Sequence, residues 1–137
     1  MSAPSCDPIQ GTVLIVDDDP LIALMMSQAF LDAGYVALTA HDAEKALEML
    51  AVTAQPIALM VTDVRMPGPM DGVELGHLAT ARYPDLAVLT MTGYALEGGR
   101  DAVGTVLQKP FAIEQLLQTA RKIMESGRYW REMMKPR

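Results

Sequence analysis

The segment VLIVDD (residues 13–18) places two carboxylates directly after four apolar residues. Three later segments repeat this arrangement of an apolar run followed by a polar side chain: IALMVTD (57–63), LAVLTMT (86–92) and VLQK (106–109). Apolar runs of this length are typical of strands buried on both faces of a parallel sheet. In such sheets the ligand site lies just beyond the carboxyl ends of the strands. The sequence therefore predicts that one crevice collects Asp17, Asp18, Asp63, Thr92 and Lys109.

Helical patterns alternate with these strands. Pro20 suits the first turn of a helix, and Leu21, Leu24 and Met25 recur at helical spacing behind it. The full pattern predicts strands over 12–17, 35–39, 57–63, 86–92 and 105–108, and helices over about 20–33, 43–50, 73–82 and 112–124. Alternation of this kind predicts an α/β fold with a doubly wound, five-stranded parallel sheet of order 2-1-3-4-5, a flavodoxin-like three-layer sandwich.

One connection departs from the pattern. Residues 93–104 contain four glycines and few periodic apolar residues. Glycine disfavours a helix by about 1 kcal/mol per position relative to alanine. We therefore expect a loop or a short, frayed helix here instead of a full crossover helix.

The composition indicates one globular domain. The chain has 137 residues, of which 50% are hydrophobic and 20% charged, and its one cysteine, Cys6, excludes an internal disulfide. No apolar stretch approaches the roughly 20 residues that a bilayer requires. A reducing cytoplasm is the expected compartment.

The net charge of −6 is unevenly distributed. Residues 1–120 carry −10 and residues 121–137 carry +4. A strongly acidic body argues against direct nucleic-acid binding. We expect a disordered lead over 1–10, a folded domain over 11–126 and a basic, aromatic extension over 127–137 that includes Tyr129 and Trp130. The extension could pack on the domain or on a second copy, so a homodimer is one expectation.

The predicted crevice suits a metal ion and a phosphoryl group. Three close carboxylates repel one another, and Mg²⁺ prefers carboxylate, carbonyl and water oxygens. An aspartate carboxylate can form an acyl phosphate, and the bound ion neutralises charge during phosphoryl transfer. Lys109 offers a positive charge and Thr92 a hydroxyl to the phosphoryl oxygens.

The segments VLIVDDDP (13–20), VTDVRMPGPMDG (61–72), LTMTGYA (89–95) and LQKPF (107–111) resemble the receiver domain of two-component response regulators. The resemblance covers about residues 11–126. It implies that Asp63 is the phosphoacceptor and that Asp17 and Asp18 form the acidic pair. It also implies that Asp18 and Asp63 bind Mg²⁺ beside the backbone carbonyl of Arg65.

The resemblance further implies that Thr92 is a switch hydroxyl and that Lys109 is the conserved-type lysine before a cis peptide bond to Pro110. The phosphoryl donor would be a histidine kinase or a histidine phosphotransfer protein. The output would be contact with a downstream protein, through a surface near residues 93–120. Receivers often carry an aromatic switch residue three positions before the lysine. That position is Val106, and the nearest aromatic residue to Thr92 is Tyr94.

Two other functions stay open. A haloacid-dehalogenase-type aspartyl-phosphate phosphatase would use Asp17 and Asp19 in a D-x-D motif, but it requires a further acidic pair beyond the lysine. The only acidic residues after Lys109 are Glu114, Glu125 and Glu132, at helix positions, and Asp63 would have no role. The second alternative is a receiver-like adaptor that is never phosphorylated.

Overall fold

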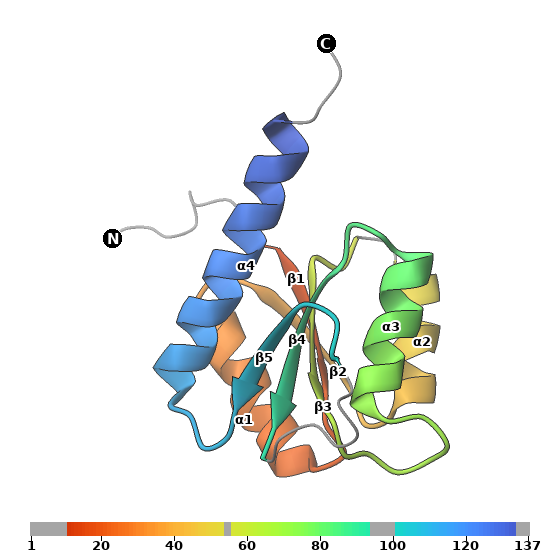
Figure 1. Cartoon of the computed structure of the whole chain (residues 1–137). Helices are drawn as coiled ribbons and strands as arrows, with labels where there is room; N and C mark the ends of the chain where they lie inside the picture. The colour runs from red at the N-terminus through yellow and green to blue at the C-terminus, as the bar shows by residue number, and fades with distance from the viewer. Residues whose placement is uncertain (1–10, 54–55, 94–100, 134–137) are drawn as a thin grey trace.

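The structure, a computed structural model, describes residues 11–53, 56–93 and 101–133, with side chains described as far as residue 126. Strands and helices follow one another along the chain (Figure 1), in the order β1 (Thr12–Val16), α1 (Pro20–Asp32), β2 (Val36–Ala40), α2 (Ala43–Val52), β3 (Leu59–Asp63), α3 (Gly72–Arg82), β4 (Ala87–Thr92), β5 (Thr105–Gln108) and α4 (Ile113–Met133). Among these residues no helix is both long and apolar enough to cross a membrane.

All five strands pair in parallel, and the sheet order β2-β1-β3-β4-β5 is the one predicted from the sequence. The central strands are buried on both faces, as their continuous apolar runs require. Because the strands are parallel and in register, their carboxyl ends meet at one edge of the sheet (Figure 1).

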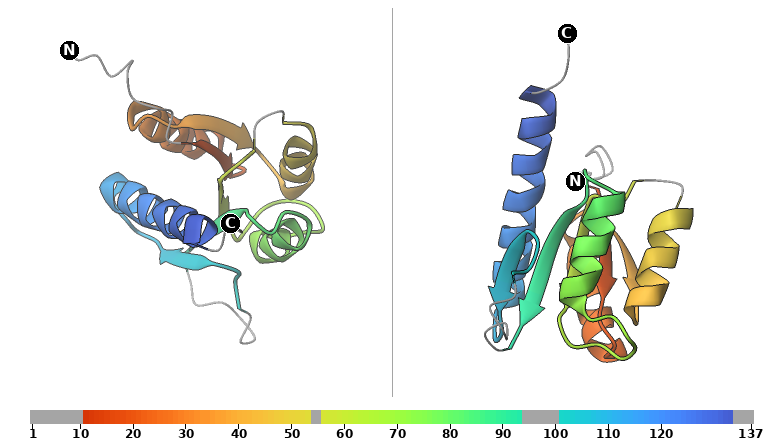
Figure 2. Two further views of the ribbon diagram at one scale, coloured as in Figure 1. Left: turned by 90° about the horizontal axis from the view of Figure 1, so that it is seen from above. Right: turned by 45° about the vertical axis from the view of Figure 1, so that its right-hand side comes forward.

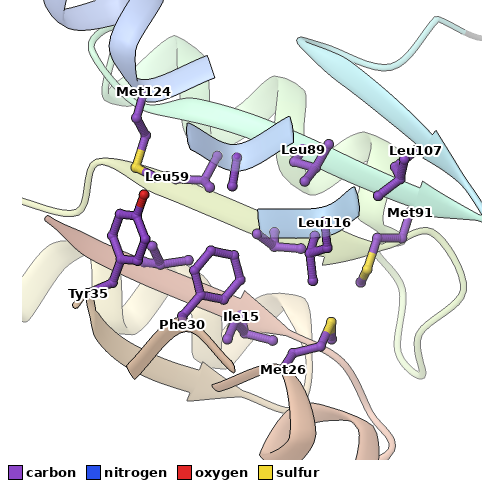
Figure 3. Close-up of a cluster of buried hydrophobic side chains, with 13 residues drawn as sticks. Ile15, Met26, Phe30, Tyr35, Leu59, Leu89, Met91, Leu107, Leu116 and Met124 are labelled. Atoms are coloured by element: carbon purple, nitrogen blue, oxygen red, sulfur yellow. The ribbon is translucent and has the colours of Figure 1, made fainter. Parts of the chain in front are cut away.

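Helices cover both faces of the sheet (Figure 2). On one face, Met26 and Phe30 of α1 and Leu116 and Met124 of α4 pack against alternate strand residues, as Figure 3 shows. Ala120 of α4 belongs to the same cluster. On the other face, the small residues Ala43 and Ala46 of α2 and Leu75 and Ala79 of α3 cover the opposite set of strand side chains. The two clusters make the three-layer sandwich that the alternating sequence predicted.

Helix α1 buries a different face from the one its most regular apolar spacing suggested. Its buried residues are Ala23, Met26, Ser27 and Phe30. Leu21, Leu24 and Met25, which also recur at helical spacing, are 64%, 61% and 56% exposed. The helix is apolar on more than one side, so spacing alone could not identify its buried face.

Several predicted boundaries differ by one or two residues, such as the end of β1 at Val16 and the start of β3 at Leu59, and two other differences have a clear cause. Strand β2 begins at Val36, because the Tyr35 N–H donates to Phe30 O (3.0 Å) in the turn after α1 instead of joining the ladder. Helix α4 does not end near residue 124 but continues to Met133. Between Ile113 and Pro136 the sequence has one strongly helix-disfavouring residue, Gly127, and one glycine does not end a helix.

The described part of the β4–β5 connection is not helical. Residues 101–104, which we call the crossover segment, lead directly into β5. Val103 packs against the cluster under α3. Gly104 has φ of +73°, and a Cβ there would lie 2.3 Å from the carbonyl oxygen of Val88. The prediction of a frayed helix or loop agrees with residues 101–104, while 94–100, including Tyr94, lie outside the described residues.

Candidate functional site

Three carboxylates converge at the carboxyl edge of the sheet, as the sequence predicted. Asp17 and Asp18 follow β1, and Asp63 is the last residue of the neighbouring strand β3. Each contributes one oxygen to a group in which all three atoms lie within 4.8 Å of one another. We call Asp17, Asp18 and Asp63 the acidic cluster.

Asp17 is the buried member of the acidic cluster, with 2% of its surface exposed. Its Oδ1 accepts a hydrogen bond from the Asp19 N–H at 2.9 Å, whereas its Oδ2 is buried and has no hydrogen-bond partner. Burial raises the pKa of Asp17, and repulsion from Asp63 and Asp18 acts in the same direction; the Asp19 N–H and Lys109 oppose the shift. A cation beside Oδ2 would supply the missing partner, so the chemistry of the cluster fits Mg²⁺.

Lys109 contacts the acidic cluster through Asp63. Its Nζ is 3.1 Å from Asp63 Oδ2, and the two side chains are 36% and 15% exposed. The Lys109 N–H donates to Thr92 O at 2.8 Å, which extends the β4–β5 pairing and fixes the backbone from which the ammonium reaches Asp63. The peptide bond from Lys109 to Pro110 is cis, as the resemblance implied.

Thr92 and Arg65 complete the predicted set of site residues. Thr92 ends β4, is 7% exposed and pairs in register with Gln108, so it lies at the same edge as Asp63 and Lys109. Arg65 follows Asp63 by two residues in the loop before α3, and its side chain is exposed. The structure therefore brings Asp17, Asp18, Asp63 and Lys109 into one cluster and places Thr92 and Arg65 on adjoining backbone.

Helix α3 starts directly against the end of β3, a feature that the sequence did not predict. Asp71 caps the helix, and Asp71 and Glu74 form a reciprocal capping box. The Gly72 N–H donates to Val64 O at 2.8 Å, and a Cβ on Gly72 would lie 1.9 Å from the carbonyl oxygen of Asp63. The Asp-Gly pair in the loop was the available signal, because glycine permits close backbone approach.

Apolar surface borders the acidic cluster. A hollow of about 290 Å³ between α1 and the β5–α4 loop is lined by Ile22, Met25, Met91 and Phe111, with Asp17 and Lys109 among its polar residues. Leu21, Leu24 and Met25, which we call the α1 patch, are exposed on the helix that follows Asp17 and Asp18. The sequence signal for this patch was a helix with apolar residues on more than one side.

One position departs from the receiver resemblance, and its neighbour on β4 is a buried threonine. Val106, which replaces the expected aromatic residue, is 42% exposed. Thr90 is its neighbour in the β4–β5 register; it is 1% exposed and its Oγ1 has no hydrogen-bond partner. No sequence pattern marked Thr90, because a strand-internal threonine is common.

The sequence matches known proteins over most of its length. The family profile of the response regulator receiver domain matches residues 13–121. The response regulator receiver protein CpdR of Brucella abortus is 33% identical over 119 residues, which cover 82% of this chain and 95% of CpdR. The response regulator protein FleR of Pseudomonas aeruginosa is 40% identical over 110 residues, 77% of this chain. The chain spans only 23% of FleR, about a quarter of that longer protein.

Solved structures have the same fold. A response regulator receiver protein from Sinorhizobium medicae superimposes with a TM-score of 0.74 at 28% identity, covering 85% of this chain and 96% of that protein. NtrX from Brucella abortus gives a TM-score of 0.79 at 26% identity over 93% of this chain and 29% of its own. The chain therefore belongs to the response regulator receiver domain family of two-component systems.

Proposed function

We propose that Asp63 accepts a phosphoryl group from a histidine kinase or a histidine phosphotransfer protein, and that this modification switches a protein-binding surface near residues 93–120. The observation that carries the proposal is the acidic cluster with the Lys109 ammonium 3.1 Å from Asp63. A strand-end carboxylate beside two further carboxylates and one cation suits a phosphoryl group that arrives with a metal ion.

Asp63 acts as the nucleophile in this proposal. One of its carboxylate oxygens attacks the phosphorus of the donor phosphohistidine, the P–N bond breaks, and its electron pair returns to the imidazole, which is protonated. Lys109 then pairs with a phosphoryl oxygen, and the Thr92 hydroxyl donates to another. The product is an acyl phosphate on Asp63, which water can hydrolyse.

Asp17, Asp18, Asp63 and the backbone carbonyl of Arg65 are the proposed Mg²⁺ ligands. The orphaned Oδ2 of Asp17 and the mutual repulsion of the three carboxylates both support a cation at this position. When bound, Mg²⁺ would neutralise the charge that develops on the phosphoryl oxygens.

The α1 patch supports docking of the donor on α1. A donor histidine must reach Asp63, so the donor must cover the surface that borders the acidic cluster. Leu21, Leu24 and Met25 supply exposed apolar area there, and the hollow beside Lys109 can accept an apolar side chain. We propose that this phosphoryl transfer takes place in the cytoplasm. Its output would be contact with a downstream protein, without direct nucleic-acid binding, and a homodimer is one form that this output could take.

Phosphate labelling distinguishes this function from the two alternatives. The chain would be incubated with acetyl phosphate and Mg²⁺, and the modified residue found by borohydride trapping and mass spectrometry. We expect the label on Asp63 and its loss in Asp63→Asn. A label on Asp17 would instead support the haloacid-dehalogenase-type phosphatase, which the family match does not favour. No label from small or protein donors would support the unphosphorylated adaptor.

A further inference from the structure

Two structural arms connect Asp63 to the crossover segment. The first arm is α3, whose first residue, Gly72, lies so close to the Asp63 carbonyl that no Cβ fits between them. The second arm is β5, which ends at Gln108; the next residue, Lys109, places its Nζ 3.1 Å from Asp63 Oδ2. A change at Asp63 therefore acts on both arms at the same edge of the sheet.

A hydrogen bond joins the middle of α3 to the crossover segment. His77, on α3, places Nε2 2.7 Å from the carbonyl oxygen of Asp101, 24 residues later in the chain. Since a carbonyl can only accept, the hydrogen must reside on His77 Nε2. The contacts close a ring that runs from Asp63 through α3, the His77–Asp101 bond, the crossover segment and β5 back to Lys109.

The His77–Asp101 bond is an exposed contact between α3 and the crossover segment. Gly72 is buried against the backbone, and Lys109 is held by a backbone hydrogen bond to Thr92 O. Gly104 fits against the carbonyl of Val88, which anchors the start of β5. His77 and Asp101 are both exposed, and a single exposed hydrogen bond changes an equilibrium by only about fivefold.

We propose that His77 is a positioning residue that latches the crossover segment to α3 and that phosphorylation of Asp63 opens the latch. This inference rests on the proposed function. When Lys109 leaves Asp63 Oδ2 for a phosphoryl oxygen, β5 shifts relative to α3, whose first turn stays on the Asp63 backbone. This relative shift of β5 and α3 breaks the hydrogen bond between His77 and the Asp101 carbonyl. Asp101 and Ala102 then leave α3 and change the surface beside it, while Val103 stays packed under the helix.

The latch predicts a reciprocal effect on the phosphorylated state. If phosphorylation opens the bond, removing the bond must favour the phosphorylated state by the same factor. The test is the affinity of the full chain for Mg²⁺ with beryllofluoride, which mimics a phosphoryl group on a carboxylate. We expect about fivefold tighter binding by His77→Ala than by wild type. His77→Gln, which keeps an N–H donor, should restore the wild-type affinity.

Backbone dynamics give a second readout. In the wild-type protein without beryllofluoride, nitrogen-15 order parameters at Asp101 and Ala102 should be about 0.85, typical of rigid backbone, and should fall below about 0.6 on binding. In His77→Ala they should be low in both states. The latch would be overturned if wild type, His77→Ala and His77→Gln bound Mg²⁺ with beryllofluoride equally tightly. It would also be overturned if the order parameters changed neither with the ligand nor with the substitution.

The failure of the latch can be told apart from the failure of the proposed function. Asp63→Asn reports whether beryllofluoride binds at the acceptor at all. If wild type and Asp63→Asn both fail to bind, the proposed function is wrong, and the latch with it. If wild type binds and Asp63→Asn does not, but His77→Ala binds no more tightly than wild type, only the latch is wrong.

Discussion

Lys109 Nζ lies 3.1 Å from Asp63 Oδ2, although 46 residues separate the two positions in the chain. The pair is partly exposed, so its attraction is screened by solvent. The pair matters for the acidic cluster as a whole, because the positive charge of Lys109 opposes the repulsion among its three carboxylates.

Replacing Lys109 should strengthen Mg²⁺ binding while weakening the response to phosphorylation. Lys109→Ala removes a positive charge that competes with the ion for Asp63, and we expect Mg²⁺ to bind about fivefold more tightly in a calorimetric titration. Lys45→Ala, which removes an exposed cation paired with Glu48, is the control and should leave the affinity unchanged. Weaker Mg²⁺ binding by Lys109→Ala would contradict a competitive role for Lys109.

Replacing Asp17 should stabilise the metal-free protein and reduce its affinity for Mg²⁺. Asp17→Asn removes a buried charge whose Oδ2 has no partner. We expect the midpoint of thermal unfolding in chelator to rise by about 3–5 °C, which corresponds to roughly 1 kcal/mol for a domain of this size. Added Mg²⁺ should stabilise wild type more than Asp17→Asn, and equal stabilisation by Mg²⁺ would remove Asp17 from the proposed ligands.

The stability of the metal-free protein should fall as pH rises through the titration of Asp17. The folded-state pKa of Asp17 is raised above its ordinary value of 3.8, chiefly by burial. Between the ordinary and the raised value, the folded protein therefore binds a proton that the unfolded chain has lost. The stabilisation from Asp17 is complete below the ordinary value and is lost as pH rises through the raised one.

Urea unfolding at a series of pH values, in chelator, measures this dependence. The free energy of unfolding of wild type minus that of Asp17→Asn isolates the contribution of the Asp17 carboxyl. We expect this difference to decrease with rising pH. A difference that is constant or increases with pH would show that burial does not raise the pKa of Asp17.

Gly72 should tolerate no side chain, whereas Gly76 on the same helix should. A Cβ on Gly72 would lie 1.9 Å from the Asp63 carbonyl oxygen, so Gly72→Ala should lower the free energy of unfolding by about 3 kcal/mol. A Cβ on Gly76 would meet Val88 Cγ1 at 3.4 Å, an ordinary contact. Gly76→Ala should therefore be neutral or stabilising by up to about 1 kcal/mol. Similar losses for both variants, measured by urea unfolding, would show that α3 does not rest on Asp63 as described.

The α1 patch should matter for protein donors more than for small donors. Leu24→Ser removes exposed apolar area beside the acidic cluster without changing any charge. We expect the ratio of the phosphotransfer rate from a histidine phosphotransfer protein to the rate from acetyl phosphate to fall about fivefold. Val52→Ser is the matched control, because Val52 is 73% exposed on α2, away from the site. An equal fall for the two variants would argue against docking on α1.

Local sequence patterns were sufficient for the strands and for the positions of the acidic residues. Runs such as residues 13–16 and 59–62 are buried on both faces, so their apolar composition reports strand identity directly. Sheet order follows from the alternation of strands and helices, and it places Asp17, Asp18 and Asp63 at one edge. The glycines of residues 93–104 also predicted that the crossover segment would not be helical.

Only the tertiary structure decided how the segments meet. It selected the buried face of α1, because a helix with apolar residues on several sides is oriented by what packs against it. It also brought Lys109 to Asp63, set Gly72 against the Asp63 carbonyl and joined His77 to Asp101. Each of these contacts links residues that are separated along the chain. The sequence determined which groups stand at the edge of the sheet, and long-range packing determined which of them touch.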